Sequence, residues 1–227
     1  MELFNPGVAV ASLGPLLAGM LLTVELTVLV ISLSLVLGLA VALARLYAPR
    51  PVVWLVLAYV ELMRGTPLLL QLIYIYYVLP ELGIRLDAFA ASVLGLTLNY
   101  SAYISEVYRS GIQGIAKGQG DAAAALGMTR PLALRRIILP QAIRLVIPSL
   151  GNFLISLFKD TALCSVVSVQ EVLFTAQLIA ARNYQYFTLY TVVGALYFIV
   201  GFGAARLVDQ LERRTRTGYR RRRPARA

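Results

Sequence analysis

Long apolar stretches separated by short charged or proline-containing turns dominate the chain. Each stretch reaches the roughly 20 residues that a helix needs to cross the hydrocarbon core of a bilayer. Because that core offers the backbone no hydrogen-bond partners, spanning segments of this kind form helices. The pattern therefore predicts an all-α, polytopic membrane protein with five transmembrane helices. The predicted spans are Leu16–Ala44, Val52–Leu79, Ala88–Tyr108, Leu145–Leu178 and Asn183–Ala205.

The basic residues are divided unevenly between the two sides of these spans. If the N-terminus lies outside, the exterior loops hold only Arg85 and Arg182, and most other Lys and Arg residues are cytoplasmic. Cytoplasmic loops of membrane proteins carry such an excess of positive charge. The sequence therefore predicts an outside N-terminus and an inside C-terminus. The expected divisions are an external segment 1–15, a transmembrane domain 16–208 with a cytoplasmic loop 109–144, and a basic cytoplasmic tail 209–227.

The composition agrees with a membrane location and limits the chemistry. Hydrophobic residues make up 59% of the chain and charged residues 14%, unlike a soluble globular protein. With no histidine and one cysteine, Cys164, neither a metal site nor a disulfide framework is predicted. The net charge of +10 raises the possibility of a nucleic-acid partner. The arginine-rich tail begins close to a span, however, so contact with anionic lipid headgroups is the preferred interpretation.

Residues 120–140 form a polar interruption between the third and fourth spans. Asp121–Ala125 is helix-forming material, with Asp121 expected in the first turn, and Gly127 is expected to end the helix in a left-handed conformation. Pro131 then opens a second short helix, Leu132–Leu139, which Pro140 limits. Two short helices joined by a tight turn predict a protruding helical hairpin to which a partner protein docks. The alternative is an amphipathic hairpin lying on the membrane surface.

A charged residue inside a membrane span costs about 2.5–3.5 kcal/mol on insertion scales, and five such residues are candidates for a functional role. They are Glu25, Glu61, Arg64, Lys159 and Asp160. One interpretation is internal pairing, of Arg64 with Asp160 or Glu25, or of Glu61 with Lys159. The other is a site for a zwitterion, in which the Arg64 guanidinium binds a carboxylate and Asp160 or Glu61 binds an ammonium group.

The stretch Gly65-Thr66-Pro67 favours the binding site. A helix broken at membrane depth is tolerated only where its free backbone groups are buried in protein or line a cavity. Thr66 and Thr161 are candidate hydroxyl ligands. Elsewhere, an interfacial aromatic belt is expected for Tyr74, Tyr76 and Tyr77, and a local ion pair is expected between Glu106 and Arg109, three residues apart.

Three motifs resemble those of bacterial ABC importer permeases. The family's EAA loop reads Glu-Ala-Ala, three residues, Gly, nine residues, Ile-x-Leu-Pro; this chain has Asp121-Ala122-Ala123, Gly127 and Ile137-Ile138-Leu139-Pro140 with every spacing intact. The departure is Asp for Glu at 121. Arg64–Leu69 and Lys159–Leu163 resemble the RGTPLL and KDTSL signatures of polar amino acid permeases, with Ala162 in place of the usual Ser.

The resemblance implies a type I ABC importer permease fold in the bacterial cytoplasmic (inner) membrane. It implies a second permease, either a copy or a paralogue, two ATPase subunits that use ATP and Mg, and an external solute-binding protein. The chain itself has no GxxxxGK(S/T) phosphate loop, so we expect it to bind no cofactor and not to be an enzyme. The residues implied to couple to the ATPase are Asp121, Ala122, Ala123, Gly127, Met128, Thr129, Arg135 and Arg136.

Other function classes remain open at this point. An ion-coupled secondary transporter would use Glu25, Glu61 or Asp160 as coupling carboxylates, although no internal inverted repeat stands out. A purely structural membrane protein would explain the charge pairs but not the break at 65–67. An intramembrane enzyme is disfavoured because there is no histidine to serve as a base. The sequence does not identify which amino acid is carried.

Overall fold

The computed structural model describes the backbone of residues 3–220 and the side chains of residues 3–213, and this part of the chain is helical with short connections. Helices α1 and α2 are joined by a two-residue turn, and π and 3-10 turns (η) extend several helices. The bounds are α1 Pro6–Tyr47, α2 Arg50–Gly65, α3 Leu68–Ile73, η1 Tyr74–Val78, η2 Leu79–Leu82, α4 Ala88–Gln113, α5 Lys117–Ala125, α6 Arg130–Ala133, η3 Leu134–Ile138, α7 Leu139–Asp160, η4 Thr161–Val167, α8 Val172–Asn183 and α9 Tyr186–Arg220.

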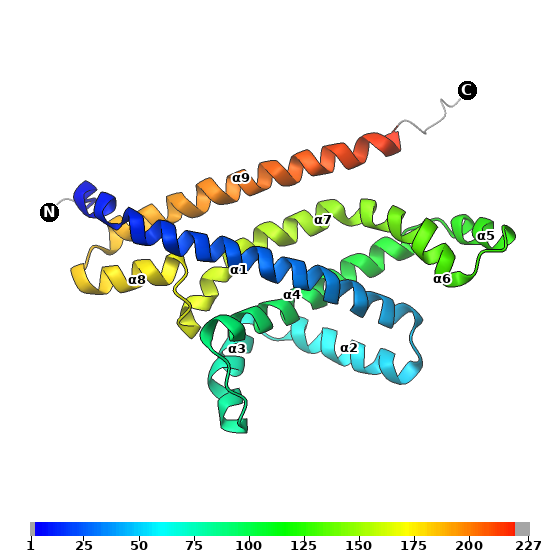
Figure 1. Ribbon diagram of the computed structural model, residues 1–227, viewed down its shortest axis with the longest axis horizontal. Coiled ribbons are helices and arrows are strands. Elements are labelled where there is room, and N and C mark those ends of the chain that lie inside the picture. The colour runs from blue at the N-terminus through cyan, green and yellow to red at the C-terminus, as the bar shows by residue number, and fades with distance from the viewer. Residues whose placement is uncertain (1–2, 221–227) are drawn as a thin grey trace.

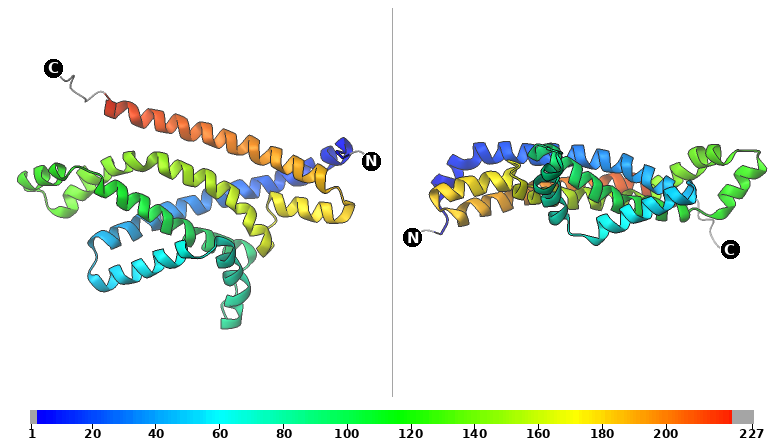
Figure 2. Two further views of the ribbon diagram at one scale, coloured as in Figure 1. Left: turned by 180° about the vertical axis from the view of Figure 1, so that it is seen from behind. Right: turned by 90° about the horizontal axis from the view of Figure 1, so that it is seen from below.

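The long helices α1, α4, α7 and α9 run along one common direction (Figure 1). The N-terminus and α8 lie at one end of this bundle. The α1–α2 turn, the α5–α6 hairpin and the C-terminal end of α9 lie at the other end, where the hairpin extends beyond the rest of the molecule (Figures 1 and 2). The α3 segment instead projects sideways from the bundle.

Three helical stretches are long and apolar enough to cross a membrane: 6–47, 130–167 and 186–213. The pair Arg50–Gly65 and Leu68–Leu82 makes a fourth if it counts as one span, bent by 107°. Helix α4 falls outside this set, and its buried positions include Ser92, Thr97, Asn99, Ser101 and Ser105. Because α4 packs against α1, α2, α3 and α7, its polar groups face protein rather than lipid. The predicted number of five spans stays a prediction.

Several predicted boundaries are wrong. The fourth span does not continue to Leu178: it ends at Val167, where Ser168 takes a left-handed conformation, and 172–183 form the separate helix α8. Pro140 does not limit a helix either. The π turn η3 precedes it, and the wider turn lets the chain continue into α7 without the usual hydrogen bond to the proline nitrogen. Residues 6–15 belong to α1, and 209–220 continue α9; the rest of the predicted tail, 221–227, lies outside the described residues.

A fully buried carboxylate, Glu171, joins α8 to α9, and the next residue, Val172, joins α8 to α1. The two oxygens of Glu171 accept hydrogen bonds from the backbone N–H groups of Leu173 (2.8 Å) and Phe174 (2.7 Å), which caps the start of α8. The hydroxyl of Tyr197 on α9 donates to the same carboxylate at 3.0 Å. The hydroxyl of Thr23 on α1 accepts from the Val172 N–H at 3.3 Å. Sequence analysis overlooked Glu171, although it lies within the predicted fourth span.

Replacing Glu171 with alanine should lower stability by about 2–4 kcal/mol, because the cap is lost and a buried hydroxyl and backbone N–H groups lose their acceptor. Thermal unfolding of the detergent-solubilised protein measures this. Glu81→Ala, which removes an exposed carboxylate from η2, is the matched control and should change the midpoint little. Equal midpoints for the two variants would contradict this account of Glu171.

Candidate functional site

Helix α2 ends at Gly65, and Thr66 and Pro67 are extended before α3 starts. Proline lacks an N–H and disfavours helical backbone in the residue before it, so the break arises where the sequence predicts it. The bend of 107° turns α3 away from the direction of α2. The end of α2 and the connecting backbone are thereby presented at mid-helix level of the bundle beside α4 (Figure 1).

Two side-chain amides satisfy carbonyl groups that this break frees. Gln71 Nε2 lies 2.9 Å from the Met63 carbonyl oxygen, 3.2 Å from that of Thr66 and 2.7 Å from the Thr66 hydroxyl. Asn99 Nδ2, on α4, donates to the Met63 carbonyl at 3.0 Å and to Gln71 Oε1 at 3.0 Å. The Thr66 hydroxyl donates back to the Leu62 carbonyl at 2.8 Å. The break is therefore a fixed, hydrogen-bonded structure.

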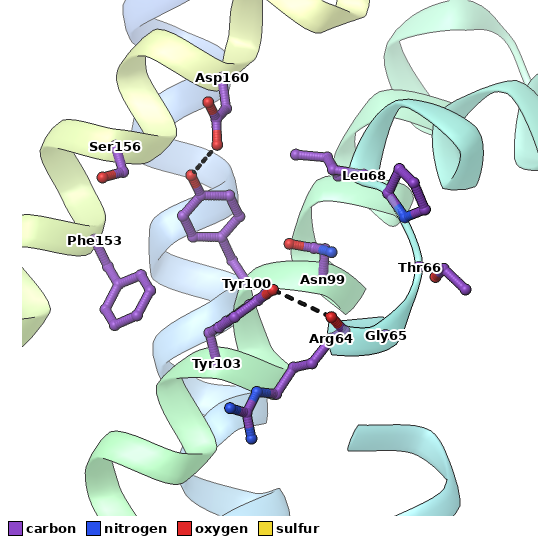
Figure 3. Close-up of a pocket in the computed structure, with 11 residues that line it drawn as sticks. Arg64, Gly65, Thr66, Leu68, Asn99, Tyr100, Tyr103, Phe153, Ser156 and Asp160 are labelled. Atoms are coloured by element: carbon purple, nitrogen blue, oxygen red, sulfur yellow. Dashed lines mark hydrogen bonds between the residues drawn. The ribbon is translucent and has the colours of Figure 1, made fainter. Parts of the chain in front are cut away.

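A cavity of about 510 Å³ lies between this break and helices α4 and α7 (Figure 3). Its wall combines the broken segment, three aromatic side chains and a few polar side chains, of which one is cationic and one is anionic. The lining residues are Arg64, Gly65, Thr66, Pro67, Leu68, Asn99, Tyr100, Tyr103, Phe153, Ser156 and Asp160.

The two charged side chains of the cavity have aromatic partners instead of each other. The Arg64 guanidinium lies over the Tyr103 ring, 5.5 Å from its centroid, a cation–π geometry. Asp160 accepts a hydrogen bond of 2.6 Å from the Tyr100 hydroxyl. Figure 3 shows Asp160 beyond Tyr100 at one end of the cavity and Arg64 beside Tyr103 at the other. Both charges therefore remain available for a ligand carrying the opposite charges.

Among the described side chains, no salt bridge joins Arg64 to Asp160 or Glu25, or Glu61 to Lys159, which are the pairs that one of the two sequence interpretations offered. Glu106 instead forms salt bridges with Arg45 and Arg109. The Glu106–Arg109 pair is confirmed at 2.8 Å. Arg45, from the end of α1, was not predicted to join it, because nothing local in the sequence places α1 beside that turn of α4.

The structure brings together half of the residues predicted to line a substrate pathway. Arg64, Gly65, Thr66 and Asp160 line the cavity. Glu25, Glu61 and Lys159 lie exposed elsewhere, and Lys159 points away from its neighbour Asp160 as adjacent helical residues must. Thr161 is buried and donates to the Phe158 carbonyl at 2.8 Å, so it is not a cavity ligand.

Sequence analysis missed the contribution of α4 to this cavity. The motif Asn99-Tyr100, with Tyr103 one turn later, carries no charge, and a charge-based search passes over it. The available signal was the amide Asn99 inside an otherwise apolar or hydroxyl-bearing span, where a polar group needs a protein partner. The α7 residues Ser156 and Phe153 lie one and two turns before Asp160, respectively, and follow from its position on the helix.

The α5–α6 hairpin has the tight turn predicted for it. Gly127 takes a left-handed conformation (φ +72°), the Met128 N–H bonds to the Ala123 carbonyl, and the Gly127 N–H bonds to that of Ala124. This pair of bonds is a Schellman motif, which ends α5. The helix starts at Lys117, so the prediction that Asp121 occupies its first turn is wrong.

The hairpin exposes most of the residues assigned to coupling. Ala123 is buried against the second arm, where Ala133 is also buried, and Met128 is half-buried. Leu126, at the tip, is 81% exposed, a large apolar side chain facing away from the molecule. The exposed members of the predicted set are Asp121, Ala122, Gly127, Thr129, Arg135 and Arg136.

Comparison with known proteins shows the family. The model of the binding-protein-dependent transport system inner membrane component matches residues 34–217. The chain belongs to this family. Its relatives include the L-cystine transport system permease protein of Bacillus subtilis, 42% identical over 89% of this chain and 88% of the relative. The arginine transport system permease protein of Bacillus subtilis is 36% identical over 82% of this chain and 85% of the relative.

Solved structures of ABC transporters share the fold. A crystal structure of an amino acid ABC transporter with histidines superposes with a TM-score of 0.88 at 36% identity, covering 94% of this chain and 100% of that one. The inward-facing MetNI methionine ABC transporter has a TM-score of 0.72 at 19% identity, covering 88% and 97%. The type I ABC permease fold is therefore confirmed, and family members are membrane components of transporters whose ATP hydrolysis belongs to a partner subunit.

Replacing Gln71 with leucine should destabilise the break, because the Thr66 carbonyl and hydroxyl lose a donor. The expected loss is about 1–3 kcal/mol, read as a lower unfolding midpoint in detergent. Gln170→Leu removes an exposed amide and serves as the control. An unchanged midpoint for the Gln71 variant would show that the break is held by other contacts.

Proposed function

We propose that this chain is the permease subunit of a type I ABC importer that carries polar amino acids across the bacterial cytoplasmic membrane. The observation that carries the proposal is the cavity at the broken helix, which offers one guanidinium and one carboxylate without pairing them. Relatives named for L-cystine and arginine, and the structural neighbour named for an amino acid, support the same cargo class.

In this proposal Arg64 binds the α-carboxylate of the substrate, because guanidinium and carboxylate form a bidentate, charge-assisted pair. Asp160 balances the α-ammonium group, with its other oxygen held by the Tyr100 hydroxyl. The rings of Tyr103 and Phe153 form apolar parts of the wall between the two charged side chains. Gly65 and Thr66 contribute the extended backbone of the break. The cavity thus matches the charge pattern of a zwitterion.

We propose five spans, with the N-terminus outside and the C-terminus inside. The support is the clustering of basic positions at the end of the bundle that carries the α5–α6 hairpin. The α1–α2 turn, the hairpin and the far end of α9 all lie at that end (Figure 2), and they contain Arg45, Arg50, Lys117, Arg130, Arg135, Arg136 and Arg213. An excess of cations on the cytoplasmic side is the general rule. In this arrangement α4 is the third span, kept in the membrane by its protein neighbours.

The hairpin is the docking element for the ATPase in this proposal. It lies beyond the bundle on the cytoplasmic side, exposes Leu126 and carries both acidic and basic side chains. ATP and Mg bind to two copies of the separate ATPase, and a solute-binding protein delivers cargo outside. A second permease, a copy of this chain or a paralogue, completes the transporter. Membrane lipid surrounds the rest, and no nucleic acid is involved.

Alanine at Arg64 or at Asp160 should lower ATP-driven uptake by roughly tenfold or more, because a charge-assisted hydrogen bond to the substrate is lost. The assay uses proteoliposomes containing this chain, its ATPase and its binding protein, with labelled arginine, histidine, glutamine, glutamate and cystine. Lys159→Ala, beside Asp160 but outside the cavity, is the control. Unchanged uptake in both cavity variants at equal membrane abundance would overturn the substrate site.

Valine at Gly127 should uncouple ATP hydrolysis from transport. A β-branched residue is strained by about 1–2 kcal/mol in a left-handed conformation, so the tip of the hairpin changes shape. Uptake in the same proteoliposomes should fall roughly tenfold while the subunit still inserts. Gly118→Val, in the α5 helix with open space around it, controls for bulk. Uptake that does not require ATP at all would instead support ion coupling.

A further inference from the structure

Asn99 lines the cavity on α4 and is only 4% exposed. It is a buried amide at the centre of the site, and neither the charges nor the motifs discussed above assign it a role in binding. Figure 3 shows it between the ends of the cavity at which Asp160 and Arg64 lie. Any ligand that contacts both charged residues passes beside this amide.

The hydrogen bonds of Asn99 fix which way its amide faces. A backbone carbonyl only accepts, so the atom 3.0 Å from the Met63 oxygen must be the nitrogen, Nδ2. The second Nδ2 hydrogen is directed to Gln71 Oε1 at 3.0 Å, and Gln71 is itself oriented by donating through Nε2 to the Met63 carbonyl at 2.9 Å. Both hydrogens of Asn99 are therefore committed to the helix break.

The remaining atom of the amide, Oδ1, has no hydrogen-bond donor among the described residues. In Figure 3 this oxygen end is directed into the cavity, and the nitrogen end is directed toward the broken segment. This oxygen is not among the fully buried side-chain atoms that lack a partner, so it is accessible from the cavity and free to accept a hydrogen bond from a ligand. Because Oδ1 only accepts, a carboxylate is excluded as its partner.

We propose that Asn99 is a substrate-binding residue whose Oδ1 accepts a hydrogen bond from the α-ammonium group of the transported amino acid. The assignment rests on the function proposed above and extends its binding site. The ammonium and carboxylate of an amino acid are attached to one carbon, so a substrate held by Arg64 needs an acceptor close to that end of the cavity. Asn99 lies between Arg64 and Asp160 and supplies that acceptor (Figure 3).

A neutral acceptor also completes the ammonium's hydrogen bonding. An ammonium group has three donors, whereas Asp160 already accepts from Tyr100 with Oδ2. Gln71 then has a second role as a positioning residue, since it holds Asn99 in the acceptor orientation. The same hydrogen-bonded unit, Gln71, Asn99 and the Met63 carbonyl, thus stabilises the helix break and orients the acceptor for the ammonium group.

The test measures equilibrium binding to the detergent-solubilised permease–ATPase complex without the solute-binding protein. The probes are labelled L-arginine, L-histidine, L-glutamine, L-glutamate and L-cystine, and for the amino acid that binds, its α-desamino analogue as an unlabelled competitor. Asn99→Ala is compared with the wild type, with Arg64→Ala and with Asn152→Ala. Asn152 is an exposed asparagine of α7 outside the cavity, so it controls for loss of an amide.

The expected result is that Asn99→Ala raises the Kd for the amino acid about tenfold, the loss of affinity expected when a hydrogen bond to a charged group is removed. The Kd of the desamino analogue, which lacks the ammonium, should be the same in Asn99→Ala and the wild type. A general loosening of the helix break would raise the Kd of the amino acid and of the desamino analogue by the same factor. Equal increases for the two ligands would therefore overturn the proposal. An unchanged Kd for the amino acid would also overturn it.

The Arg64 variant separates the two proposals. If Arg64→Ala weakens binding and Asn99→Ala does not, the substrate site stands and only the role of Asn99 is lost. If Arg64→Ala leaves the Kd unchanged, or no probe binds to the wild type, the proposed substrate site itself fails and the assignment of Asn99 fails with it.

Discussion

The need to satisfy backbone groups where α2 breaks determines the arrangement of the centre of this protein. A carbonyl without a hydrogen-bond donor at membrane depth costs several kcal/mol, so a chain can leave the helix there only if side chains replace the lost bonds. Gln71 and Asn99 do so for the carbonyls of Met63 and Thr66. One amide comes from the segment after the break and the other from α4. The break therefore fixes α3 and α4 relative to α2, and the cavity is the space that this leaves.

Helix α4 shows how protein neighbours substitute for hydrophobic composition. Its Ser101 hydroxyl lies 2.6 Å from that of Tyr59 on α2, and the same tyrosine donates to the Leu98 carbonyl at 2.7 Å. On the α1 side, a Cβ added to Gly38 would meet Ile104 at 2.8 Å, so glycine is what allows the two helices to approach. A helix enclosed in this way can bury polar groups: Asn99, Ser101 and Ser105 have protein partners, whereas the Ser92 and Thr97 hydroxyls have none among the described residues. Its low hydropathy is thus a consequence of its central position.

Local signals in the sequence were sufficient for some features, and tertiary contacts decided the others. The break at Gly65–Pro67 and the left-handed Gly127 follow from backbone chemistry at single positions, and both were predicted. Pro140 was expected to end a helix, but the π turn Leu134–Ile138, which ends two residues before it, accommodates a proline inside a helix, and no residue type predicts such a turn. Arg64 and Asp160 line one cavity, as the binding-site interpretation expects, and they do not form the salt bridge that the alternative offered. Their partners, Tyr103 and Tyr100, lie on α4, and only the packing of α4 against α2 and α7 brings them there.

Two of the helices that line the cavity, α4 and α7, also flank the α5–α6 hairpin in the chain. Helix α4 runs from Asn99 and Tyr103 to the Glu106 ion cluster and ends at Gln113, next to α5; α7 leads from the hairpin to Asp160. Gly111 brings α4 against Val146 and Ala142 of α7 close to the hairpin, and Tyr100 bonds to Asp160 at the cavity.

Helices packed this closely move as units, because interfaces between them change between discrete arrangements and do not deform continuously. A force applied to the hairpin therefore acts on the wall where Tyr100, Tyr103 and Asp160 lie. Conversely, a ligand held between α4, α7 and the break favours whichever arrangement of the hairpin keeps those residues together, and this reciprocity requires no contact between the two sites.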